Sequence, residues 1–156
     1  MMKAVAAGLI SGLSLVATAH AEMFKDKSGQ AVYVALPFED TKMPDGSTVR
    51  RIMHNGVATA DLPPPWDQVR HQCTGTIHIS ADGKPGRGHG YCEILSIKGD
   101  RASFSWVGDS GVGGRWSYFD GAGAFAGIKG EGTYKVKHAF PGGVFVNEWT
   151  GSWQTD

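Results

Sequence analysis

Three side chains that can bind or move protons alternate along one short segment: His89, Tyr91 and Glu93. In an extended strand, residues two positions apart point to the same face, so the three would form one row. Such a row suits the polar end of a ligand or general acid–base work. The outer face of an antiparallel sheet also carries polar residues, so a solvated surface is the competing interpretation. The row becomes a binding site only if it points inward.

Arg115 follows two glycines and precedes Trp116, where its guanidinium group is able to hold a carboxylate or stack on the indole. The alternative is a cross-strand pair with Glu148, worth about 0–1 kcal/mol if exposed. In an enzyme, Glu93 or Glu148 would be the acid–base group. Tyr91 or His89 would donate a hydrogen bond, and Arg115 would anchor an anion.

Trp106 is one of five tryptophans, four of which fall in predicted strands. Their rings suit the wall of an apolar cavity with one or two polar anchors. The alternative is that they fill the interior of a small barrel. Together with the row of three, Arg115 and Glu148, Trp106 completes the predicted ligand-binding set.

The two cysteines, Cys73 and Cys92, are symmetric about the turn dipeptide Asp82-Gly83. A hairpin centred there places them opposite each other, which predicts a cross-strand disulfide worth about 3 kcal/mol. A metal site formed by both thiols with His71 and His89 is the alternative, but the spacing matches no standard zinc pattern. The sequence predicts neither a metal site nor a cofactor.

The glycine-rich run at residues 121–134 indicates strands, because each interior glycine in a helix costs about 1 kcal/mol against alanine. We expect a strand, a tight corner and a second strand there. Asn55-Gly56 is typical of a turn, and the proline-rich segment 61–66 suits a crossover or a plug over one barrel end. Alternating or extended runs indicate about eight strands, at residues 30–36, 48–54, 70–79, 87–97, 101–107, 115–119, 134–138 and 144–153. These strands predict an all-β barrel or sandwich without a helix.

Several short motifs make the second half of the chain, residues 72–153, similar to exported bacterial proteins with an allene oxide cyclase-like β-barrel. They are Cys73-Thr74-Gly75-Thr76, Gly88-His89-Gly90-Tyr91-Cys92, Lys98-Gly99-Asp100, Gly113-Gly114-Arg115-Trp116, the run at 121–134 and Trp149-Thr150-Gly151-Ser152-Trp153. The resemblance implies a single eight-stranded, mostly antiparallel barrel of allene oxide cyclase-like or calycin-like type. The cyclase acts on an oxidised fatty acid, but no residue matches its active site, so the resemblance implies the fold and not the reaction. Barrels of this kind often associate, so a homo-oligomer is one expectation.

Residues 1–21 have the pattern of a signal peptide: a basic start, an apolar stretch and Ala19-His20-Ala21 as a cleavage site. This predicts a periplasmic or secreted protein with no membrane span after cleavage. Residues 22–69 would supply the N-terminal strands and the crossover of the barrel, and residues 70–156 its core. The chain has 15 basic and 15 acidic residues with no basic block, which argues against nucleic acid as a partner.

An eight-stranded barrel has an interior that is either filled by side chains or able to hold one small ligand. The first hypothesis is therefore an exported, non-enzymatic barrel that binds a small, mostly apolar molecule or serves as an interaction module. The second is an isomerase or cyclase acting on a small apolar substrate inside the barrel. The third is a structural periplasmic protein. An open interior would favour the first two, and an ionisable cavity residue with a displaced pKa would favour the enzyme.

Overall fold

Nine strands account for most of residues 21–156, the part of the chain that the computed structural model describes. The predicted signal peptide lies outside the described residues, apart from Ala21. The one helical element in the described part is a short 3-10 turn, η1 (Gly123–Phe125). The strands are β1 (Met23–Ala35), β2 (Glu39–Lys42), β3 (Thr48–Ala60), β4 (Gln68–Ile79), β5 (Pro85–Ser96), β6 (Arg101–Asp109), β7 (Gly113–Ala122), β8 (Lys129–Phe140) and β9 (Val144–Gln154).

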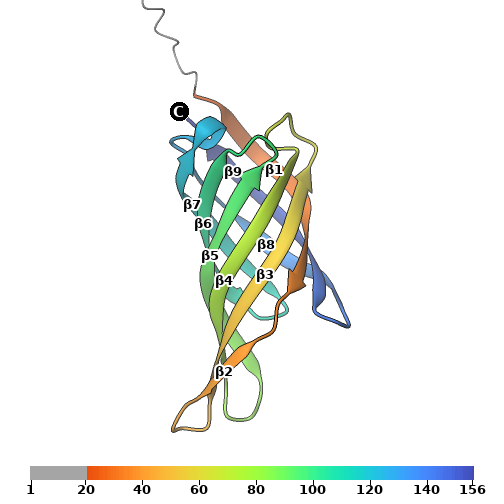
Figure 1. Cartoon of the computed structure of the whole chain (residues 1–156), viewed down its shortest axis with the longest axis vertical. Coiled ribbons are helices and arrows are strands. Elements are labelled where there is room, and N and C mark those ends of the chain that lie inside the picture. Colours follow the sequence, from red (N-terminus) through yellow and green to blue (C-terminus); the bar gives the residue numbers. More distant parts are fainter. Residues whose placement is uncertain (1–20) are drawn as a thin grey trace, which may run out of the picture.

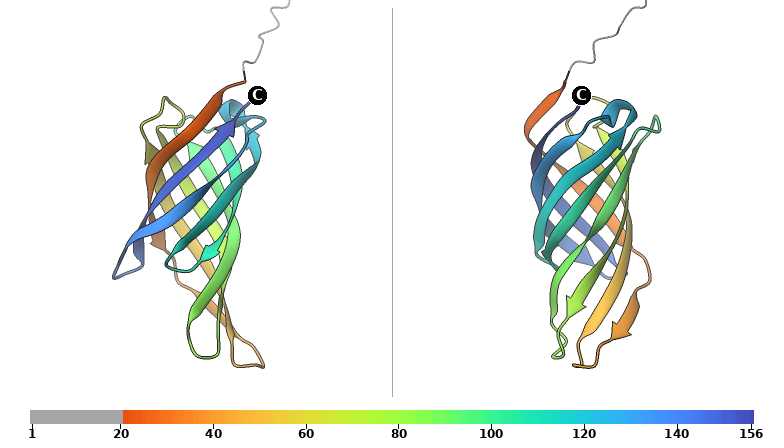
Figure 2. Two further views of the ribbon diagram at one scale, coloured as in Figure 1. Left: turned by 180° about the vertical axis from the view of Figure 1, so that it is seen from behind. Right: turned by 90° about the vertical axis from the view of Figure 1, so that its left-hand side faces the viewer.

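Eight of the strands close into an antiparallel barrel (Figure 1). The sheet order is β1-β9-β8-β7-β6-β5-β4-β3, and β1 also pairs with β3, which closes the ring. β1 leaves β3 at the pair Ala35–His54, and β2 then takes its place beside the first half of β3. Figure 2 shows β2, β3, β4 and β5 projecting together beyond the other strands at one end of the barrel. The predicted eight-stranded, all-β barrel is confirmed.

The disulfide between Cys73 and Cys92 is present, with an S–S distance of 2.03 Å. The two residues face each other across β4 and β5, as the symmetry about Asp82-Gly83 predicts. Both sulfur-bearing side chains are buried in the barrel interior. The disulfide therefore fixes which face of both strands points inward.

The prediction of a turn at Asn55-Gly56 is wrong, because both residues lie inside β3. Gly56 pairs with Tyr33 on β1, and a Cβ atom at Gly56 would lie 2.5 Å from the Tyr33 ring. The glycine provides room for a ring and does not turn the chain. Long strand pairing on both sides of β3 overrides the local turn preference of the dipeptide.

Inward-facing glycines beneath aromatic rings recur around the barrel. A Cβ atom at Gly29 would lie 2.5 Å from the Trp149 ring, and one at Gly132 would lie 2.4 Å from the Trp116 ring. A barrel of this size has little interior space, and bare glycine backbone lets the large rings lie close against the wall. The run at 121–134 also forms the predicted strand, corner and strand, with η1 at the corner.

The segment between β3 and β4 closes one end of the barrel with Trp66, which is only 6% exposed. Its ring centroid lies 5.3 Å from that of Phe24, 4.4 Å from that of Phe125 and 5.2 Å from that of Trp153. This aromatic cluster, Phe24, Trp66, Phe125 and Trp153, is called the plug below. Because the plug fills this end, any interior space opens toward the opposite end. Within the described residues, no helix is long and apolar enough to cross a membrane.

Candidate functional site

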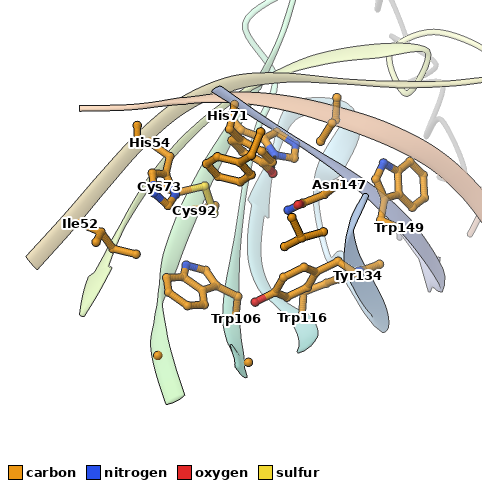
Figure 3. Close-up of a pocket in the computed structure, with 18 of the residues that line it drawn as sticks. Ile52, His54, His71, Cys73, Cys92, Trp106, Trp116, Tyr134, Asn147 and Trp149 are labelled. Carbon is orange, nitrogen blue, oxygen red and sulfur yellow. Dashed lines mark hydrogen bonds between the residues drawn. A yellow bond between two sulfur atoms is a disulfide. The ribbon is translucent and has the colours of Figure 1, made fainter. Parts of the chain in front are cut away.

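A cavity of about 390 Å³ occupies the barrel between the plug and the opposite, open end. Its wall comes from the inward-facing positions of the strands that form the ring (Figure 3). Most of its surface is aromatic or aliphatic, which suits an apolar ligand. The rings and polar groups that matter most are Tyr33, His54, His71, Phe104, Trp106, Trp116, Tyr118, Tyr134, Phe145, Asn147 and Trp149.

Three of the cavity tryptophans owe their positions to glycines. Trp116 lies against Gly132 and Gly151. Trp106 lies against Gly90, and Trp149 lies against Gly29. Residues with a Cβ atom at these positions would push the indoles into the cavity. The glycine pattern therefore keeps the interior open, while Trp66 and Trp153 fill the plug end.

Tyr33 and His71 form a hydrogen-bonded pair in the cavity wall, with 2.7 Å between the Tyr33 hydroxyl oxygen and His71 Nδ1. Both are buried, and His71 is only 7% exposed. Burial lowers the pKa of His71 from 6.5 to about 4 and raises the pKa of Tyr33. Both groups are therefore uncharged near pH 7 and act there as neutral hydrogen-bonding groups.

The other titratable groups deep in the wall are uncharged for the same reason. Burial lowers the pKa of His54 to about 4, and the ring of His54 packs edge-on against Phe145 at 4.8 Å. Burial raises the pKa of Tyr118. The pKa of Tyr134 is raised to about 12, mainly by burial and to a smaller extent by the negative charge of Asp109. Among the described residues, those deep in the cavity thus carry no net charge at neutral pH.

The charged residues that line the cavity among the described residues, Arg50 and Asp109, belong to its open end. Arg50 is the third residue of β3, and Asp109 is the last of β6. The Arg50 guanidinium donates two hydrogen bonds of 2.8 Å to Asp40 and lies 4.8 Å from the centre of the Phe38 ring. Because Asp40 accepts these bonds, its pKa is lowered. The Arg50 charge is therefore already paired.

Among residues 21–156, Asn147 is the one amide side chain in the wall, and it projects into the space between His71, Trp106 and Trp116 (Figure 3). It is 9% exposed, and its Oδ1 atom has no hydrogen-bond partner within the described residues. A buried polar group without a partner costs about 1–3 kcal/mol. Trp149, two residues along the same strand face, likewise has an unpartnered indole nitrogen.

The structure brings only Trp106 of the six predicted ligand-binding residues into the cavity. His89, Tyr91 and Glu93 do share one face, but it is the outer one. Tyr91 is 59% exposed and meets Phe119 edge-on at 5.8 Å, while Glu93 pairs with Arg101 at 3.0 Å. The reason is the disulfide: Cys92 points inward, so its neighbours in sequence point outward.

Arg115 and Glu148 also lie on the outer face, outside the cavity. They do not pair with each other, because Arg115 faces Thr133 across β7 and β8. Glu148 instead pairs with Lys137 at 3.2 Å. The suggested cross-strand pair is therefore wrong, and the suggested interior roles of these residues have no support from their placement.

The predicted set lacks several polar cavity residues, among them Tyr33, His54, His71 and Asn147. One signal for His71 was available in the sequence, because His71 and Cys73 are two residues apart and share the face of the buried disulfide. Nothing comparable marks Asn147, since the inward face of its strand is set by the barrel as a whole. No group of three or more His, Cys, Asp or Glu side chains among residues 21–156 is placed to hold a metal ion.

Comparison of the sequence with protein-family models and with curated proteins finds no match. Among solved structures, the chain is similar to that of the pterocarpan synthase dirigent protein GePTS1, with a TM-score of 0.55 and 12% sequence identity. The similarity covers 94% of this chain and 96% of that chain. At this identity the likeness establishes a shared barrel fold, and the site must be judged from its own residues.

Proposed function

We propose that this protein binds a small, mostly apolar molecule inside its barrel. The observation that carries the proposal is the aromatic cavity of about 390 Å³, closed by the plug at one end and open at the other. Its volume falls in the range of small-molecule sites, about 300–1,000 Å³. A purely structural barrel would gain stability by filling this space, because an empty interior forfeits packing contacts.

The structural neighbour supports a small-molecule site without identifying the ligand. It is named as a pterocarpan synthase, and its barrel spans nearly the same length as this one. The relation to allene oxide cyclase-like proteins rests on the motifs of the second half and remains a prediction.

The Tyr33–His71 pair favours a second candidate, an isomerase or cyclase that uses the same cavity. A neutral imidazole hydrogen-bonded to a phenol can pass a proton to or from a bound substrate. The His54 ring also lies near Tyr33, with 6.3 Å between ring centroids. Such an enzyme would bind its substrate in the same cavity and would also convert it to product there.

We also propose that the protein works outside the cytoplasm, in the periplasm or after secretion. The disulfide between Cys73 and Cys92 supports this location, since such bonds persist in oxidising compartments. The signal-peptide pattern of residues 1–21 is the second support.

Blocking the open end should prevent uptake of an uncharged apolar probe, N-phenyl-1-naphthylamine. Ala139 lines the cavity, yet it is exposed, so Ala139→Trp places an indole in the opening without disturbing the plug. We expect the wild-type protein to give a saturable fluorescence increase, and the variant to bind the probe about ten-fold more weakly or worse. Fluorescence titration measures both affinities.

Thr74→Trp is the matched control, because Thr74 is exposed on the outer face of β4. It adds the same indole to the surface and should leave the affinity unchanged. Equal affinity of the wild type and Ala139→Trp, or no saturable signal from the wild type, would contradict the proposed site.

A further inference from the structure

The proposed function leaves the amide of Asn147 unexplained. On the adjoining strands, Asn147 pairs with Ala31 of β1 and Val136 of β8, whose side chains neither donate nor accept hydrogen bonds. Its nearest neighbours on its own strand face are Phe145 and Trp149. On these three strands the amide is therefore surrounded by apolar and aromatic groups, and among residues 21–156 its Oδ1 has no hydrogen-bond partner.

A packing role does not account for an asparagine at this position. Leucine has a similar size and would suit the same apolar surroundings without an unpartnered carbonyl. Buried polar groups in folded proteins are normally hydrogen-bonded, so an exception needs an explanation. Oδ1 is covered by its neighbours in this structure, but the side chain lines the cavity, and a turn of the amide about its Cβ–Cγ bond would bring Oδ1 within reach of a ligand (Figure 3).

The surroundings of Asn147 also limit the charge of that partner. His54, His71 and Tyr33 in the same wall are neutral near pH 7, because burial disfavours their charged forms. The charged groups that the described residues contribute to the wall, Arg50 and Asp109, belong to the open end, and Arg50 is paired with Asp40. A charged ligand group beside Asn147 would lose its hydration and meet no opposite charge.

The rest of the wall favours a flat aromatic ligand. Trp106 and Trp116 lie against inward-facing glycines, and Phe104 and Tyr118 meet edge-on at 5.9 Å. Aromatic side chains bind aromatic ligands through stacked and edge-on contacts. An asparagine amide offers both an N–H donor and a carbonyl acceptor, and a second amide complements both at once.

We propose that the cavity binds an uncharged, planar aromatic molecule carrying a carboxamide or lactam group that pairs with the Asn147 amide. This inference rests on the proposed function. With the amide turned toward the cavity, the ligand N–H donates to Asn147 Oδ1, and the ligand carbonyl accepts from Asn147 Nδ2. The aromatic part lies among the indole and phenyl rings of the wall.

Three probes of similar shape test the proposal: naphthalene, 2-naphthamide and 2-naphthoate. Titration of the tryptophan fluorescence at pH 7 gives the affinity of the wild-type protein for each. We expect 2-naphthamide to bind about ten-fold more tightly than naphthalene, and 2-naphthoate to bind about ten-fold more weakly than 2-naphthamide or worse. Asn147→Leu should lose the advantage of 2-naphthamide and keep its affinity for naphthalene.

Asn55→Leu is the matched control, because Asn55 is exposed on the outer face of β3. It makes the same chemical change away from the cavity and should leave all three affinities unchanged. Circular dichroism and the mass of the oxidised chain establish that both variants fold.

The outcomes separate this inference from the proposed function. Equal binding of naphthalene and 2-naphthamide, unchanged by Asn147→Leu, would overturn the inference and leave the cavity as a ligand site. Equal weakening of both probes by Asn147→Leu would also overturn it, because a purely structural role predicts that result. Binding of 2-naphthoate as tight as that of 2-naphthamide would overturn the claim of an uncharged ligand. If no probe binds the wild type, the proposed function fails together with the inference.

Discussion

When the pH falls from 7 to 4, the variant His71→Gln is expected to lose about 3 kcal/mol less of its free energy of unfolding than the wild-type protein. Burial lowers the pKa of His71 from 6.5 to about 4 in the folded protein. The unfolded chain therefore binds the proton first as the pH falls. The stability that His71 contributes as a neutral group is present above pH 6.5, declines as the pH falls toward 4, and changes little below that.

Glutamine cannot titrate, and its side-chain carbonyl can still accept a hydrogen bond from the Tyr33 hydroxyl, the group that His71 now contacts. Urea unfolding at pH 7 and pH 4 measures the free energy of unfolding of both proteins. Other groups that titrate, such as His54 and Asp40, are the same in both and cancel in the difference. If the wild type and the variant lose equal free energy of unfolding between pH 7 and pH 4, His71 is not the source of this acid sensitivity.

The second large effect is expected at the plug, where Trp66→Ala should cost about 3–5 kcal/mol of folding free energy. Trp66 contacts three rings of the plug and is almost fully buried. Its loss leaves a void that the surrounding strands cannot close, because inter-strand hydrogen bonds hold the strands of the closed barrel in place. Urea unfolding at pH 7 gives the difference directly.

Phe119→Ala is the control for this change, since Phe119 is 57% exposed on the outer face. Removing an exposed ring should change the free energy of unfolding by about 0.5 kcal/mol or less. Equal losses in the two variants would mean that Trp66 is not the principal contact that seals this end of the barrel.

The strands and the disulfide could be predicted because their signals are local. Alternation of apolar and polar residues marks a strand directly, and the symmetry about Asp82-Gly83 needs only the spacing of Cys73 and Cys92. The turn at Asn55-Gly56 was wrong because the same dipeptide suits a long strand when a ring needs space over its glycine. That need arises from Tyr33, which belongs to another strand.

The cavity residues were harder to predict because the inward face of each strand depends on the closed ring. The row of His89, Tyr91 and Glu93 attracted attention through its chemistry, while the buried Cys92 between them determines that it faces outward. Asn147 has no such marker, and only the barrel brings it opposite His71 and Trp106. Chemically suggestive residues in a barrel are therefore best weighed after a buried residue has fixed the face of their strand.

Contacts between a bound molecule and the cavity wall would test the central claim most directly, and intermolecular nuclear Overhauser effects measure them. With isotope-labelled protein and unlabelled 2-naphthamide, the account predicts contacts from the ligand to the indole protons of Trp106 and Trp116, which line the cavity. Contacts confined to Tyr91 and Phe119, the exposed pair on the outer face, would contradict it.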